Sequence, residues 1–131
     1  MHLHHPYEAL IRHQTQSKVI RKLALTGDGW SKEIQPAIEE ILLTNPIEFA
    51  NINTCFVFGN DFFKKLFDVP CLTSKKKQFC INIENSEKFC EFRPNLQIEK
   101  AANHVIWKRD EGVQVSMELR KSNVALFTFS K

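Results

Sequence analysis

The clearest pattern in the chain is a strict alternation of apolar and polar residues near its C-terminus. Every second residue from Val113 to Leu119 is apolar and the residues between them are polar, so an extended segment here would have one buried and one wet side. Residues 110–112 and 121–123 have the composition of short turns. The sequence therefore predicts a meander of three strands at about 104–109, 113–120 and 124–129.

Two earlier segments alternate in the same way. The apolar residues Ile52, Phe56 and Phe58 recur at even spacing, and a second alternation runs from Phe79 to Ile83. Each segment is expected to form a strand. Residues 86–92 fit neither a helical nor a strand period.

Helical spacing is found closer to the N-terminus. From Pro6 to about Leu25 the apolar residues recur at helical intervals, which predicts an amphipathic helix. Gly27 and Gly29 would end it, because glycine tolerates the positive φ of a helix terminus. The outer face of this helix would be basic and would carry Arg12, Lys18, Arg21 and Lys22.

Two further helices are expected. Pro36 suits the first helical position, and Asn45-Pro46 would end the second helix. A short third helix would begin at a cap formed by Asn60 or Asp61 and end near Phe67.

Together these elements predict an α+β fold. Two N-terminal helices and the short third helix would pack on a mostly antiparallel sheet that ends in the three-stranded C-terminal meander. No repeat or linker-like stretch divides the sequence, so residues 1–131 are expected to form a single domain, with residues 1–5 flexible.

Composition supports a packed interior. The chain is 43% hydrophobic and 25% charged, which is ordinary for a globular protein. It has 11 phenylalanines and one tyrosine, and phenylalanine has no polar tip that must stay wet. We expect the phenylalanines to fill the core, and the alternative is that some of them form a patch for a partner.

The N-terminal segment and the cysteines indicate in which compartment the protein is expected. The segment Met1 to His5 lacks a secretory pattern, and no apolar run is long enough to span a membrane. We therefore expect a cytoplasmic protein, without a membrane partner, whose four cysteines are reduced and mostly buried.

Candidate chemistry is sparse. The cluster of His2, His4 and His5 offers imidazole ligands for a metal, but no nearby pair of ligands would complete a closed site, so no metal or cofactor is expected. The residues with catalytic potential are not selected by any spacing, and we expect no enzyme. They are His13, Asp61, Cys71 and His104.

Two functional hypotheses remain. The first is a small non-enzymatic protein-binding module, such as an inhibitor, an immunity-type protein or an adaptor, because a complete core sequence lacks a catalytic set. The alternative is a basic nucleic-acid-binding domain, since the net charge is +3 and basic residues cluster. Its binding residues would be Arg12, Lys18, Arg21, Lys22, Lys75, Lys76 and Lys77. An enzyme with a cleft between the helices and a curved sheet is a third possibility.

Overall fold

The computed structural model describes residues 8, 11, 13, 19–27, 29–69, 76–84, 91–109, 112–121 and 123–130. Two α-helices and seven strands lie in these ranges, with short 3₁₀ turns at Lys32–Ile34 and Pro94–Leu96. In chain order the elements are β1 (Lys22–Thr26), α2 (Gln35–Thr44), β2 (Phe49–Asn53), α3 (Asn60–Phe67), β3 (Lys77–Asn82), β4 (Gln97–Ala101), β5 (His104–Lys108), β6 (Gln114–Lys121) and β7 (Val124–Ser130).

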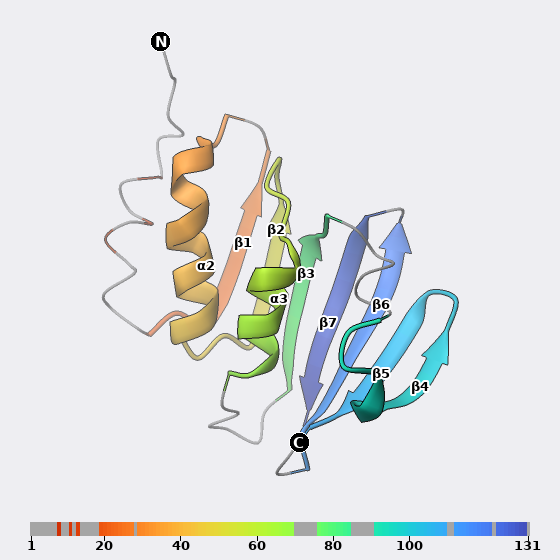
Figure 1. Ribbon diagram of the computed structural model, residues 1–131. Helices are drawn as coiled ribbons and strands as arrows, with labels where there is room; N and C mark the ends of the chain where they lie inside the picture. Colours follow the sequence, from red (N-terminus) through yellow and green to blue (C-terminus); the bar gives the residue numbers. More distant parts are fainter. Residues whose placement is uncertain are drawn as a thin grey trace.

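All seven strands belong to one mixed sheet. Their order across the sheet is β1-β2-β3-β7-β6-β5-β4. The pairs β1–β2 and β2–β3 are parallel, and every other pair is antiparallel. The helices α2 and α3 connect the parallel strands, and both lie on the same face of the sheet (Figure 1). This placement follows from right-handed crossovers between strands that are added in one direction.

The predicted fold class is wrong in its N-terminal half. The three strands expected at the C-terminus are β5, β6 and β7, and their bounds agree with the expected ones within two residues. However, the expected layout of three helices on a mostly antiparallel sheet is replaced by a mixed sheet, of which β1, β2 and β3 form a parallel half. Each described α-helix is a crossover between parallel strands.

The first helix was predicted to extend too far toward the C-terminus. Glu8, Ile11 and His13 are helical, but residues 22–26 form β1, and residues 14–18 lie outside the described part of the chain. Leu23 continues the helical spacing of Val19 and Ile20, whereas Leu23 and Leu25 together fit a period of two, so the local pattern is ambiguous. The segment forms a strand because it pairs with β2, from Lys22 opposite Phe49 to Thr26 opposite Asn53.

The first strand expected along the chain is displaced. It was expected at 52–58, but β2 ends at Asn53 and a loop follows. Side chains hold this loop: the Thr54 hydroxyl accepts from the Phe56 amide at 3.2 Å, and the Asn82 side chain donates to the Thr54 carbonyl at 2.9 Å. Such bonds compete with a strand ladder for the backbone groups. Phe58 then rejoins the sheet through an isolated parallel bridge to Ile83.

The cap of α3 also differs from the prediction. Its N-cap is Gly59 and not Asn60 or Asp61, and no side chain caps the helix. A Cβ atom on Gly59 would lie 2.9 Å from an Oε atom of Glu84. This atom is the far end of a flexible side chain that can move aside, so the contact alone does not require glycine at this position.

Aromatic residues make the core between α3 and the meander. The ring centroid of Phe63 in α3 lies 4.7 Å from that of Phe127 in β7 and 5.6 Å from that of Trp107 in β5. The Trp107 indole donates to the main-chain oxygen of Phe92 at 2.7 Å. Eight phenylalanines are buried, which confirms that most of them fill the core. They are Phe56, Phe58, Phe62, Phe63, Phe67, Phe79, Phe127 and Phe129.

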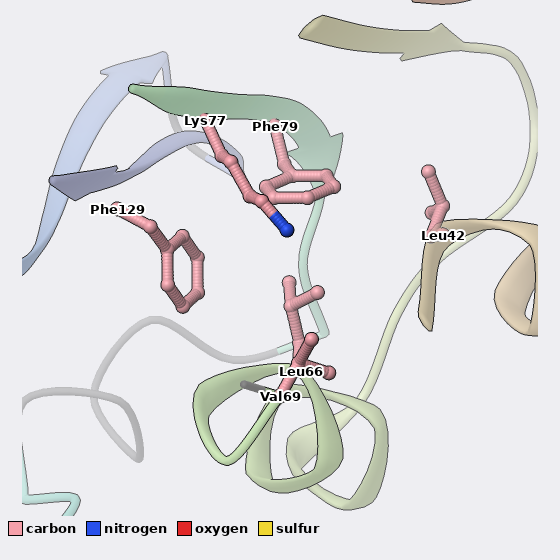
Figure 2. A pocket seen from close by; sticks show the side chains of 6 residues that line it. All are labelled: Leu42, Leu66, Val69, Lys77, Phe79 and Phe129. Atoms are coloured by element: carbon pink, nitrogen blue, oxygen red, sulfur yellow. The ribbon is translucent and has the colours of Figure 1, made fainter. Parts of the chain in front are cut away.

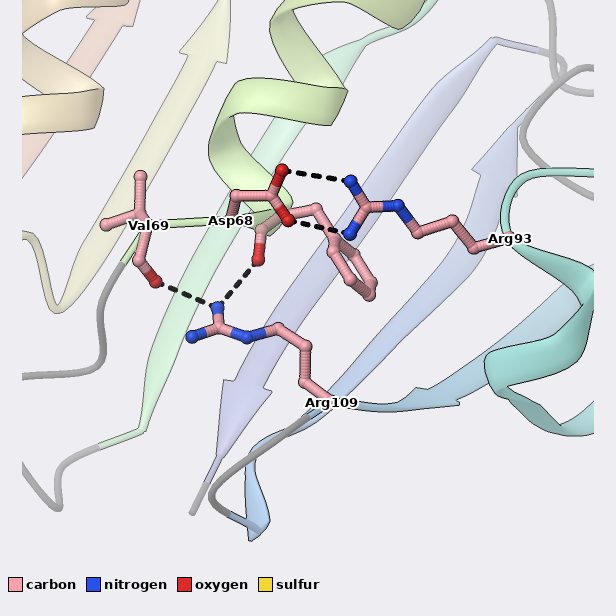
Figure 3. A network of polar contacts seen from close by, with 5 residues as sticks. Asp68, Val69, Arg93 and Arg109 are labelled. Atoms are coloured by element: carbon pink, nitrogen blue, oxygen red, sulfur yellow. Dashed lines mark hydrogen bonds and ion pairs between the residues drawn. The ribbon is translucent and has the colours of Figure 1, made fainter.

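Two arginines tie the C-terminal end of α3 to the rest of the protein (Figure 3). Arg109 donates to the main-chain oxygens of Phe67 at 2.6 Å and Val69 at 2.8 Å. A cation is favourable here because the last carbonyls of a helix have no partner within the helix. Arg93 binds Asp68 and lies over the Phe67 ring, 4.8 Å from its centroid.

Candidate binding surface

The face of the sheet that points away from α2 and α3 is a candidate binding surface. In β2, Ala50 and Ile52 are buried toward the helices, so Phe49, Asn51 and Asn53 point the other way. No described helix lies on that side of the sheet (Figure 1). We call it the uncovered face.

Strand register arranges the uncovered face in rows. Residues directly opposite each other on neighbouring strands point to the same side, so the pairing gives the row directly. One row across six strands is Ala24, Asn51, Cys80, Leu126, Glu118 and His104. The next row is Lys22, Phe49, Gln78, Thr128, Ser116 and Ile106.

These rows mix apolar and polar side chains. Leu126 and Ile106 are half-buried, and Phe49 is 39% exposed, although phenylalanine usually lies inside. Most of their neighbours are uncharged polar residues. The uncovered face can therefore offer apolar contacts and hydrogen bonds together.

A hollow of about 220 Å³ opens on the uncovered face. Arg120 reaches it from β6, beside a register irregularity between Leu119 and Lys121. We call it the amide hollow, because asparagines dominate its lining: Asn51, Asn53, Asn82, Arg120, Cys80 and Val124.

An acidic depression lies at the start of α2 and α3. Its volume is about 470 Å³, and Glu39, Asp61 and Glu84 are among its lining residues. Burial raises the pKa of the Glu39 carboxyl, and the positive charge of Lys65 opposes this to a lesser degree. Within the described ranges, no group of three His, Cys, Asp or Glu residues could hold a metal ion. The described residues of the depression therefore do not assemble a metal site.

The predicted nucleic-acid residues are only partly brought together. Four of them lie at or just before the start of a parallel strand: Arg21 and Lys22 at β1, and Lys76 and Lys77 at β3. Because β1, β2 and β3 run in parallel, these starts lie at the same end of the sheet. Arg21 is paired with Glu48 at 3.8 Å. Arg12, Lys18 and Lys75 lie outside the described residues.

Lys77 is directed away from the uncovered face. Figure 2 shows it with Phe79 and Leu42 around a small pocket between the sheet and the helices. The pocket holds about 10 Å³, far below the roughly 300 Å³ at which ligand pockets begin, and Lys77 is its one polar lining residue. This pocket is too small for a ligand, and Lys77 does not join Lys22 on one surface.

Two of the residues considered for catalysis, His104 and Asp61, lie on opposite sides of the sheet. His104 is half-buried on the uncovered face in β5, whereas Asp61 is exposed in the first turn of α3, at the acidic depression. Cys71 and the cluster of His2, His4 and His5 lie outside the described residues.

Sequence reasoning missed the residues of the amide hollow. The alternation in β2 does place Asn51 and Asn53 opposite the buried side, and the alternation in β6 does the same for Arg120. The sequence could not show that β2, β3 and β7 are adjacent in the sheet, because this order results from long-range pairing.

Comparison with family models, with curated proteins and with solved structures finds no match for this chain. The helices in the described part of the chain are all too short or too polar to cross a membrane.

Proposed function

We propose that this chain is a non-enzymatic protein-binding module of the cytoplasm that uses the uncovered face to form a stoichiometric complex, as an inhibitor, an immunity-type protein or an adaptor does. The observation that carries this proposal is the set of accessible apolar side chains, Phe49, Leu126 and Ile106, that lie among polar neighbours on a sheet face without a described helix. Protein interfaces combine such apolar anchors with a polar surround.

The chemistry of the described residues supports binding over catalysis. His104 and Asp61 lie on different elements, and the acidic depression contains carboxylates without a neighbouring nucleophile. A binding surface needs shape, a few anchors and complementary charge, and the uncovered face offers these without further chemistry.

The test is capture of a partner from extracts of the source cells with the full chain as bait. The bait variants Leu126→Arg and Thr128→Arg place a large cation in the middle of the uncovered face, at half-buried positions. The control Glu40→Arg adds the same side chain at an exposed position on α2. We expect one protein to bind the wild type and the control in a fixed ratio and to be lost with both face variants.

Two results would contradict the proposal. Equal capture by all four baits would show that the uncovered face is not the binding surface. Turnover of a substrate by the isolated protein, abolished by one point mutation, would show that the chain is an enzyme.

A second candidate function is binding of single-stranded nucleic acid. One specific observation favours it: the exposed ring of Phe49 lies directly opposite Lys22 on the uncovered face, and Arg21 and Lys76 are near the same edge. Aromatic rings stack on bases and lysines neutralise phosphates.

Salt dependence tests this second candidate. Binding of an oligonucleotide should weaken as salt rises, and Arg21→Glu with Lys22→Glu should reduce that slope. Phe49→Ala should weaken binding at every salt concentration. Absence of binding at about 50 mM salt, where phosphate contacts are still strong, rejects this function.

A further inference from the structure

The amide hollow has the composition of a small anion site. Its polar lining comes from three strands that are distant in sequence: Asn51 and Asn53 from β2, Asn82 from β3 and Arg120 from β6. Its volume of about 220 Å³ is below the ~300 Å³ at which sites for drug-sized ligands begin. It therefore fits one side chain or a similarly small group.

Within the described part of the chain, three of the side chains that line the hollow have no competing partner. Among the described residues, neither Arg120 nor the side chains of Asn51 and Asn53 have a hydrogen-bond or ion-pair partner. The Asn82 side chain is different, because its nitrogen already donates to the Thr54 and Phe56 carbonyls. Asn82 is thus fixed as part of the wall, while the other three side chains can turn to a bound group.

A local irregularity in β6 positions the arginine. Leu119 is opposite Ala125 and Lys121 is opposite Val124, so Arg120 lies where the ladder changes register. Such irregularities redirect side chains at a sheet surface. Val124 and Arg120 line the same hollow, so the Arg120 side chain lies beside the end of β7 on the uncovered face.

We propose that the amide hollow binds a carboxylate group, and that in the complex this is an aspartate or glutamate side chain of the protein partner. The source of the carboxylate rests on the proposed function, whereas the chemistry of the hollow does not. One guanidinium matches one negative charge and forms a two-bond pair with the two oxygens of a carboxylate. The Asn51 and Asn53 amides donate to the same oxygens or bond the neighbouring peptide group.

The direct test is an NMR titration of the full chain with the small carboxylate N-acetyl-aspartate N-methylamide. Its neutral counterpart is N-acetyl-asparagine N-methylamide, and dimethyl phosphate serves as the probe for a nucleic-acid phosphate. We expect the Arg120 Nε–H and the Asn51 and Asn53 amide signals to shift and saturate with the carboxylate, at concentrations on the order of 1–10 mM for a group of this size.

Two variants make the test specific. Arg120→Gln removes the guanidinium and should weaken binding of the carboxylate at least about tenfold, since hydrogen bonds between two charged groups are stronger than those between neutral groups. Lys108→Gln removes one positive charge from another exposed position on the uncovered face and should leave the titration unchanged. The dispersion of the amide spectrum shows that each variant is folded.

Several results would overturn the inference: no saturation with the carboxylate, equal binding of the neutral amide, preference for dimethyl phosphate, or an Arg120→Gln titration like that of the wild type. The proposed function fails separately, when capture of the partner does not depend on Leu126 and Thr128. A partner that depends on those residues but binds Arg120→Gln as strongly as the wild type contradicts this inference alone.

Discussion

Asp68 and Arg93 are 25 residues apart in the chain and form a pair with two hydrogen bonds, of 2.6 and 2.9 Å. The pair connects the end of α3 to the turn before β4. The hydrogen bond from Arg93 lowers the pKa of the Asp68 carboxyl, and the same bond raises the pKa of Arg93. The pair is partly open to solvent, since 51% of the Asp68 side chain is exposed.

Asp68→Asn should therefore change stability in a pH-dependent way. Because the pKa of Asp68 is lowered in the folded state, its stabilisation is present above the unfolded carboxyl value of about 3.9 and is lost as the pH falls through the folded value. We expect the variant to be about 0.5–1 kcal/mol less stable at pH 7, as for a solvent-exposed ion pair.

Denaturant unfolding between pH 7 and pH 2 measures this effect. The difference between Asp68→Asn and the wild type should shrink as the pH drops and should vanish at the acid end. The exposed Glu91 is a suitable comparison, and Glu91→Gln should have little effect. A constant difference at every pH would mean that the ion pair is not the cause.

Glu39→Gln should change stability at pH 7 in the opposite direction and stabilise the protein. Burial raises the pKa of Glu39, so the wild type has its full stability below the unfolded value of about 4.3 and loses some as the pH rises through the folded value. The neutral variant avoids that loss and should be more stable at pH 7 by about a few tenths of a kcal/mol, within the usual range for surface changes. Unfolding curves at pH 7 and pH 3.5 provide the check, and lower stability at pH 7 would show that attraction by Lys65 outweighs burial.

Two phenylalanine substitutions separate the core from the uncovered face. Phe127 is completely buried, so Phe127→Ala should cost about 3–5 kcal/mol. Phe49 is 39% exposed, so Phe49→Ala should cost less than about 1 kcal/mol. Melting temperatures of the two variants compare them directly, and an equal loss would show that the ring of Phe49 is covered in solution.

Gly112 precedes β6 and has a positive φ of 76°. No atom lies within 4 Å of a Cβ built there, so the cost of Gly112→Ala comes from the backbone conformation alone. We expect a loss of about 1 kcal/mol, as for other residues forced into the left-handed region. Gly112→Asn should lose less in the same unfolding experiment, because asparagine tolerates this region better. Equal stability of the three proteins would mean that the turn changes its conformation.

Much of the sheet could be predicted from local pattern. The strands β5, β6 and β7 were found because their apolar and polar residues alternate strictly, and neighbours along the chain pair as a meander. The helices α2 and α3 were found for a similar reason: Pro36 and the apolar stripe from Phe62 to Phe67 are local signals.

The parallel half of the sheet was decided by tertiary structure. Leu23 has helical spacing from Val19 and strand spacing to Leu25, and only the pairing of these leucines with Ala50 and Ile52 selects the strand. A parallel pair has no local turn signal, because its strands are joined by a crossover that includes a helix.

By itself, the sequence determined which segments are amphipathic and therefore which side chains avoid water. The tertiary structure alone decided that α2 and α3 share one face, so that the other face carries Phe49 and the amide hollow. The physical reason is that periodicity assigns a side chain to one of two sides of its own segment, while strand order determines which segments become neighbours. Asn51 and Arg120, 69 positions apart, meet in one hollow only through the order β2-β3-β7-β6.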